Sequence, residues 1–167
     1  MNNRTKEMVT AAVLAAFACV ATMIIKIPSP FKGYLNMGDC IVLLSGWMLS
    51  PIYGFLAAGI GSALADVFLG YVTYAPATFV IKGMVAVIAF YIFKLFENRF
   101  KKLGSWIISG VLAEIFMVVG YFVFEAFLYG FTPSLVNIPA NGVQGIVGII
   151  VGVALAKILK RFDNISE

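Results

Sequence analysis

Long apolar segments separated by short polar breaks extend along the whole chain. We expect helices over residues 5–25, 39–49, 51–69, 77–96, 104–128 and 140–161, and no charged residue interrupts 8–25 or 126–156. A helix needs roughly 20 mostly apolar residues to cross the hydrocarbon core of a bilayer. The breaks contain glycine, proline or charge, and Gly130, Pro133 and Pro139 predict an outer loop before the last helix.

Composition restricts the class of protein further. Apolar residues make up 62% of the 167 residues and charged residues only 12%, whereas soluble domains have about 25% charged residues. One soluble core of this size would not bury so much apolar surface, so the excess must face lipid. The predicted fold is an all-α membrane protein, a six-transmembrane-helix bundle that forms one domain over residues 1–167.

The basic residues predict the orientation of this bundle. Nine of the twelve lysines and arginines fall into three groups, which are Arg4 with Lys6, then Lys94, Arg99, Lys101 and Lys102, and finally Lys157, Lys160 and Arg161. Basic residues stay on the cytoplasmic side of a membrane. Four spans between the first two groups and two between the last two place both termini inside. We interpret the net charge of +4 as a topology signal and not as a nucleic-acid-binding surface.

The chain lacks the residues that several kinds of catalysis and nucleotide binding require. The chain has no histidine, no Gly-Lys phosphate-binding loop and no G-x-S-x-G nucleophile motif. Its two cysteines, Cys19 and Cys40, lack metal-ligand spacing and are expected to be packing residues. We therefore expect no enzyme activity, no metal and no cofactor, and any ATP used in transport must be hydrolysed by another chain.

Four charged residues lie inside the predicted spans, namely Asp66, Lys82, Glu114 and Glu125. A charge at the bilayer centre costs about 3 kcal/mol or more, so each should face the bundle interior. Asp66 and Lys82 lie at similar depth on neighbouring antiparallel helices, which predicts an ion pair. A contact between Lys82 and a ligand is the alternative. Asp39, at a predicted helix start, is expected to cap that helix, and ligand binding is its alternative role.

Polar side chains also share one face of the fifth predicted helix. Glu114, Tyr121 and Glu125 follow a spacing of seven and four residues. Further polar groups near the outer end are Tyr34, Asn36, Tyr74, Asn141 and Gln144. Their convergence favours a small-ligand cavity, and the competing interpretation is hydrogen bonding between helices.

Small residues recur at four-residue spacing on two helices. The first helix carries the pairs Ala11/Ala15 and Ala12/Ala16, and the last carries Gly148, Gly152 and Ala156. Such patterns allow close helix packing, either inside the bundle or against a partner protein. Trp47 and Trp106, near predicted inner ends, are expected to anchor the membrane interface.

The sequence resembles the S components of energy-coupling factor transporters along nearly its whole length. The similar segments are Gly33-Tyr34-Leu35-Asn36-Met37-Gly38-Asp39, Gly59-Ile60-Gly61-Ser62-Ala63-Leu64-Ala65-Asp66, Gly70-Tyr71, Ala75-Pro76-Ala77-Thr78-Phe79-Val80-Ile81-Lys82-Gly83, Glu114-Ile115-Phe116-Met117-Val118-Val119-Gly120-Tyr121 and Asn141-Gly142-Val143-Gln144-Gly145. The resemblance implies a subunit of the prokaryotic cytoplasmic membrane that binds a vitamin from outside. A transmembrane coupling protein and two ATP-binding-cassette ATPases would be its partners.

The resemblance also assigns residues. It implies substrate binding by Asn36, Tyr74, Lys82, Glu114, Tyr121, Asn141 and Gln144, and docking to the coupling protein by Ala11, Ala12, Ala15 and Ala16. The subgroup it resembles has members assigned to riboflavin, pyridoxine or hydroxymethylpyrimidine. The implied pocket, with aromatic walls, a cation and carboxylates, favours a small pyridine or pyrimidine such as pyridoxine or hydroxymethylpyrimidine first and riboflavin second. The alternative function is a proton- or cation-coupled carrier that uses Glu114 and Glu125.

Overall fold

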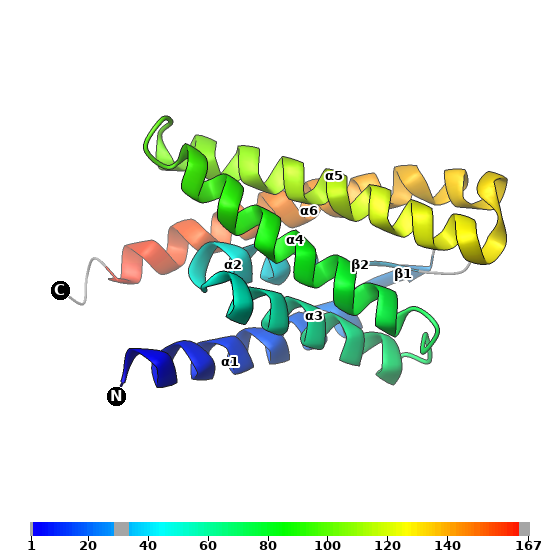
Figure 1. The fold of residues 1–167 in the computed structure, drawn as a ribbon, viewed down its shortest axis with the longest axis horizontal. Helices are drawn as coiled ribbons and strands as arrows, with labels where there is room; N and C mark the ends of the chain where they lie inside the picture. Colours follow the sequence, from blue (N-terminus) through cyan, green and yellow to red (C-terminus); the bar gives the residue numbers. More distant parts are fainter. Residues whose placement is uncertain (1, 29–33, 164–167) are drawn as a thin grey trace.

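The computed structural model describes residues 2–28 and 34–163, so Pro30, Lys32 and Gly33 of the predicted outer loop lie outside the described residues. The described elements are α1 (Asn3–Ile24), β1 (Lys26–Pro28), β2 (Tyr34–Asn36), α2 (Asp39–Met48), α3 (Pro51–Phe68), α4 (Ala75–Phe96), α5 (Lys102–Tyr129) and α6 (Phe131–Asp163). The helices run along one long axis, as Figure 1 shows. The start of α1 and the end of α6 lie at one end of this axis, and the two strands lie at the other.

The strands form an antiparallel pair that the sequence did not predict. Ile27 faces Leu35 across the pair, and Lys26 faces Asn36. Each strand has only three residues, too few for an apolar–polar alternation to be recognised. The pair matters because it holds Tyr34 and Asn36 at the end of the bundle where polar residues of the helices gather.

Five of the six helices are long and apolar enough to span a bilayer within the described residues. The sixth, α2, has ten residues, which gives a helix of about 15 Å against a hydrocarbon core of about 30 Å. It packs against α1, α3, α4 and α6, and most of its residues are buried. The architecture is thus a six-helix bundle built around a short central helix.

The predicted loop before the last helix is helical. The only break between α5 and α6 is at Gly130, whose φ of 92° favours glycine. Pro133 lies in the first turn of α6, where a missing N–H breaks no intrahelical bond, and Pro139 is accommodated inside the helix. The prediction of a loop containing Pro133 and Pro139 was therefore wrong, and the longer helix brings Asn137 into the bundle.

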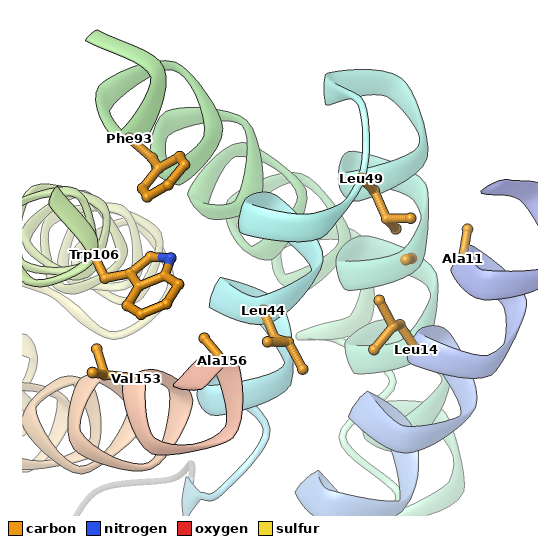
Figure 2. Packing of buried hydrophobic residues seen from close by; sticks show 9 residues of the cluster. Ala11, Leu14, Leu44, Leu49, Phe93, Trp106, Val153 and Ala156 are labelled. Carbon is orange, nitrogen blue, oxygen red and sulfur yellow. The ribbon is translucent and has the colours of Figure 1, made fainter. Parts of the chain in front are cut away.

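Apolar side chains from all six helices form the core near the end that holds the termini (Figure 2). Trp106 is 7% exposed and stacks on Phe93 with ring centroids 6.2 Å apart. The indole N–H of Trp47 donates to the Ser109 hydroxyl at 2.9 Å. Trp106 therefore packs in the core and is not the interface anchor that was predicted, whereas Trp47 is half-buried and packs against Trp106.

The small residues allow close helix packing. A Cβ at position 61 of α3 would overlap the backbone carbonyl oxygen of Ala15 on α1, so these two helices approach backbone to backbone. The α6 stripe of Gly148, Gly152 and Ala156 faces inward, with Gly148 and Gly152 against Asp39 and Cys40 of α2. Packing within the bundle therefore accounts for the α6 stripe.

Candidate functional site

A polar cavity lies at the strand-bearing end of the bundle, between β2, the α3–α4 turn, α5 and α6. Its volume is about 40 Å³, measured as the space open to the centres of water molecules, which is room for roughly three waters. The lining residues are Tyr34, Asn36, Asp66, Tyr71, Tyr74, Thr78, Tyr121, Glu125, Asn137, Asn141 and Gln144. Five separate elements thus contribute polar groups to one enclosed space.

Aromatic rings form one wall of this cavity. The rings of Tyr34 and Tyr71 lie 4.8 Å apart between centroids, and those of Tyr71 and Tyr74 lie 6.2 Å apart. Tyr74 also packs against Phe124 at 5.4 Å. Flat apolar faces beside hydroxyl groups suit a planar ligand with polar substituents.

Two carboxylates supply the negative charge of the cavity. The Tyr34 hydroxyl donates to Asp66 Oδ1 at 2.5 Å. Burial and the neighbouring Asp66 raise the pKa of Tyr34 above its usual range, so the phenol remains a donor. Asp66 Oδ2 is buried and makes no hydrogen bond of normal length with any described residue, although the Thr78 side chain lies close enough to interact with this carboxylate. That oxygen is the most evident acceptor left for a ligand.

Glu125 lies on the other side of the cavity and is held from two elements. Asn137 Nδ2 donates to its Oε2 at 3.0 Å, and the Tyr74 hydroxyl lies 3.5 Å from its Oε1. Between the two carboxylates, the Tyr121 hydroxyl donates to Thr78 Oγ1 at 3.1 Å. These bonds fix the side chains in place, and preorganised groups bind a ligand at lower entropic cost.

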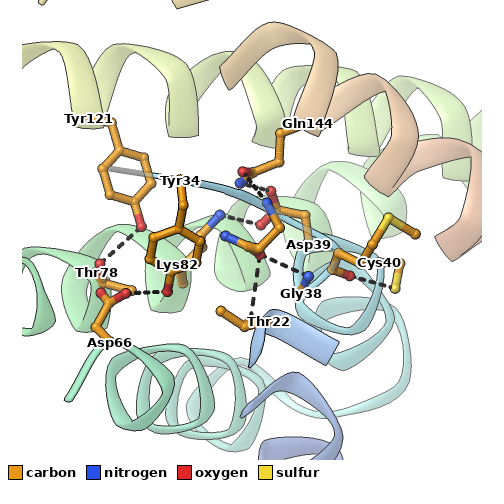
Figure 3. A network of polar contacts seen from close by, with 12 residues as sticks. Thr22, Tyr34, Gly38, Asp39, Cys40, Asp66, Thr78, Lys82, Tyr121 and Gln144 are labelled. Carbon is orange, nitrogen blue, oxygen red and sulfur yellow. Dashed lines mark hydrogen bonds and ion pairs between the residues drawn. The ribbon is translucent and has the colours of Figure 1, made fainter. Parts of the chain in front are cut away.

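A buried network lies next to the cavity (Figure 3). Lys82 forms an ion pair with Asp39, and their side chains are 3% and 0% exposed. Asp39 Oδ2 accepts a hydrogen bond from Gln144 Nε2 at 2.6 Å, and Gln144 Oε1 accepts one from the Asn36 backbone N–H at 2.9 Å. The pair on α2 and α4 thereby orients the Gln144 amide, which in turn holds β2 over the cavity.

These contacts correct two expectations. The predicted Asp66–Lys82 ion pair is wrong, because Lys82 pairs with Asp39 and Asp66 bonds to Tyr34 instead. Asp39 does not cap α2 either. It is the first helical residue, no side chain caps the helix, and its carboxylate faces Lys82 and Gln144. The sequence predicted Asp66 as the partner because it lies at a similar membrane depth to Lys82. The short buried helix α2 instead places Asp39 beside Lys82.

Comparisons with known proteins identify the family and the fold. The sequence profile described as "ECF-type riboflavin transporter, S component" matches residues 2–161. The chain belongs to this family of S components. It is 40% identical over 143 residues to the "Uncharacterized protein in gap 3'region" of Pyrococcus woesei, covering 85% of this chain and 93% of that protein.

Solved S components share the architecture. One is the protein of "Structure and mechanism of the S component of a bacterial ECF transporter", at TM-score 0.75 and 28% identity, covering 96% of this chain and 98% of that one. An S component for biotin matches at TM-score 0.63 and 22% identity, covering 94% of each chain, and supports the fold alone. S components are vitamin-binding subunits of transporters, work without a cofactor and are not enzymes.

The structure of this S component brings together five of the seven predicted substrate-binding residues. Asn36, Tyr74, Tyr121, Asn141 and Gln144 all line the cavity. Lys82 and Glu114 do not. Lys82 forms an ion pair with Asp39, and its ammonium lies 5.3 Å from the centroid of the Tyr121 ring.

Glu114 has an unusual environment for a carboxyl group. It is 4% exposed, and neither of its oxygens has a hydrogen-bond partner among the described residues. It packs against Gly145 of α6, at the edge of an apolar groove between α5 and α6. It is therefore a buried acid that does not line the cavity.

Sequence reasoning left some cavity residues out of the predicted set. Asp66, Glu125 and Tyr34 were recognised as polar groups of the outer half, and their polarity inside or beside apolar segments was the signal. Thr78, Tyr71 and Asn137 were not singled out. Threonine and tyrosine are common in membrane helices, and Asn137 lay in a segment predicted to be a loop.

The four docking alanines divide into two kinds. Ala11 is buried and Ala15 half-buried, since both face α3, whereas Ala12 and Ala16 are exposed on the outer face of α1. The exposed pair lines a shallow apolar groove between α1 and α3, together with Ile60 and Leu64. Ala12 and Ala16 are therefore the exposed pair of the four, and the half-buried Ala15 also lines this groove.

Proposed function

We propose that this S component captures a small water-soluble vitamin in the cavity beneath the strand pair. The observation that supports this most directly is the enclosed polar cavity, in which the buried Asp66 Oδ2 makes no hydrogen bond of normal length with any described residue. A buried acceptor without a hydrogen bond is costly, and a ligand that donates to it removes this cost. Asn36, Tyr74, Tyr121, Asn141 and Gln144 are the other proposed contacts.

We also propose that the bundle crosses the prokaryotic cytoplasmic membrane six times, with both termini inside and with the short α2 making the second crossing in the bundle interior. The termini share one end of the bundle, and the cavity lies at the opposite end (Figure 1). The basic groups near residues 4, 94–102 and 157–160 all lie toward the end with the termini, and basic residues favour the cytoplasm. In this orientation the cavity faces outside, where the vitamin is captured.

The lining of the cavity favours one chemical class of vitamin. It contains two carboxylates, and none of the described lining residues is basic. A ligand that donates hydrogen bonds or carries positive charge suits this lining, whereas a phosphate ester would be repelled. The cavity has room for roughly three waters, so either kind of vitamin must enlarge it, and a single substituted ring requires less enlargement than three fused rings. A pyridine or pyrimidine such as pyridoxine or hydroxymethylpyrimidine is therefore our first substrate. Riboflavin is the second, because the family profile is described by that vitamin.

Calorimetric titration of the purified chain in detergent tests this ranking. We expect pyridoxine or hydroxymethylpyrimidine to bind with a submicromolar Kd. The phosphate ester of the same vitamin should bind at least roughly 100-fold more weakly, since the carboxylates repel it. Tight riboflavin binding without binding of either single-ring vitamin would overturn the ranking and leave the S-component function intact. Tighter binding of the phosphate ester would contradict the charge argument.

For uptake, we propose that the chain works with a transmembrane coupling protein and two ATP-binding-cassette ATPases. The exposed Ala12 and Ala16 pair is the proposed docking surface, because small residues let a partner helix approach closely. Ala11 and Ala15 support this surface from within by packing on α3.

Tryptophan at positions 12 and 16 tests the docking surface. We expect Ala12→Trp/Ala16→Trp to abolish co-purification with the coupling protein, because two indoles would keep the partner helix away. Vitamin binding by the isolated chain should change less than about threefold. Ala154→Trp, at an exposed alanine of α6, is the control and should still co-purify. Unchanged association of the double variant would show that the partner docks elsewhere.

A further inference from the structure

A second cavity lies at the opposite end of the bundle from the vitamin site. It has a volume of about 290 Å³ and lies where α2 and α4 end, α5 begins and α6 continues toward its terminus. Its apolar wall includes Trp47, Phe93, Trp106 and Ala156. Figure 2 shows the ring of Trp106 between Phe93 and the α6 residues Val153 and Ala156. The vitamin-binding mechanism makes no use of this cavity.

Lysines from three helices line the same cavity. Lys94 comes from the last turn of α4, Lys102 from the first residue of α5, and Lys160 from the end of α6. Lys94 lies 3.2 Å from Glu97, the one acidic lining residue. Lys102 and Lys160 make no salt bridge with any described residue. The cavity thus presents three lysines against one glutamate beside an apolar aromatic wall.

We propose that this cavity binds one anionic phospholipid. The cationic groups lie at helix ends, the level at which lipid phosphates meet a membrane protein. The phosphodiester would accept hydrogen bonds from Lys102 and Lys160, and an acyl chain would lie along Trp47 and Trp106. A basic pocket between helix ends is a recognised form of lipid headgroup site. This proposal does not depend on which vitamin the outer cavity holds.

The competing explanation is that these lysines only set the topology. In that case any lysines at this end would attract anionic lipid equally. Lys101 and Lys157 offer a matched comparison, because each is exposed and lies one or three residues from a lining lysine, yet neither lines the cavity. Lys102→Gln/Lys160→Gln and Lys101→Gln/Lys157→Gln remove the same charge from the same end of the protein.

Native mass spectrometry of the full-length chain, titrated with phosphatidylglycerol or phosphatidylcholine, measures the lipid affinity of the unmodified chain and of each variant. We expect one phosphatidylglycerol to bind in preference to phosphatidylcholine. Lys102→Gln/Lys160→Gln should weaken that binding roughly 30-fold, the change expected for two lysine contacts with an anionic lipid. Lys101→Gln/Lys157→Gln should weaken it less than about threefold. Lys102→Arg/Lys160→Arg, which keeps the charge, should retain the lipid.

Three results would overturn the proposal. Equal loss in the two Gln variants would show a general charge effect, and equal binding of the two phospholipids would exclude headgroup recognition. If only Lys102→Gln/Lys160→Gln lost association with the coupling protein while its lipid binding stayed unchanged, the cavity would be a protein contact. Calorimetry with the vitamin verifies folding, because the outer cavity lies at the far end and its Kd should be the same in all three variants.

Discussion

Replacing Lys82 with methionine is expected to lower the free energy of unfolding by about 3–5 kcal/mol, the cost of removing one partner from a buried ion pair. Methionine fills most of the lysine volume but leaves the Asp39 carboxylate, which is fully buried, without its cation. Gln144 would remain its only hydrogen-bond donor from a described side chain. Chemical unfolding in detergent, followed by circular dichroism, measures this loss.

Two further variants isolate the cause. Lys94→Met breaks an ion pair whose lysine side chain is 54% exposed, and it should cost less than about 1 kcal/mol. Adding Asp39→Asn to Lys82→Met removes the orphaned charge and should recover part of the lost stability. If Lys82→Met were as stable as Lys94→Met, the buried pair would not be the stabilising contact described here.

Neutralising the cavity carboxylates is expected to produce the largest loss of vitamin binding. Asp66→Asn keeps the shape of the side chain and can still accept from Tyr34, but it replaces Oδ2 with a nitrogen that only donates. A hydrogen bond to a charged group contributes about 1.5–3 kcal/mol, so the Kd should rise roughly 10- to 150-fold. Glu125→Gln should have a similar effect, and the double variant a larger one.

Glu114→Gln is the matched control for these variants. It also neutralises a buried carboxyl group of a membrane helix, but Glu114 lies outside the cavity. Its effect on the Kd, measured by the same calorimetric titration, should be less than about threefold. The reverse pattern, with Glu114→Gln abolishing binding and Asp66→Asn leaving it intact, would place the vitamin between α5 and α6 instead.

The helices were predictable because each is an apolar segment of suitable length, and membrane helices need little else. The start of α6 could not be predicted, because Pro133 and Pro139 suggested a loop. The helix accommodates Pro133 in its first turn and Pro139 in its interior, where other contacts stabilise it. The strand pair was missed because three-residue strands carry no periodic pattern. Its position depends on tertiary bonds such as Asn36 to Gln144.

Polar residues inside apolar segments were sufficient to locate the cavity at one end of the bundle. The spacing from Tyr121 to Glu125 correctly predicted one inward face of α5. The spacing of residues predicts how deep each lies in the membrane and which face of its helix it shares. It does not predict which residue of a neighbouring helix it contacts. For this reason the partner of Lys82 was predicted to be Asp66, when the short α2 places Asp39 closer. Glu114 shares the helix face of Tyr121 but lies below the cavity.

Uptake of radiolabelled vitamin into proteoliposomes tests the central claim, that this chain binds a vitamin but depends on partners to transport it. The measurement compares liposomes that contain the chain alone with liposomes that contain the chain, the coupling protein and both ATPases. We predict tight binding but no uptake by the chain alone, and uptake by the complete assembly only when ATP reaches the ATPases. Uptake by the chain alone, driven by a proton gradient and abolished by an uncoupler, would contradict this account and favour a carrier that uses Glu114 and Glu125.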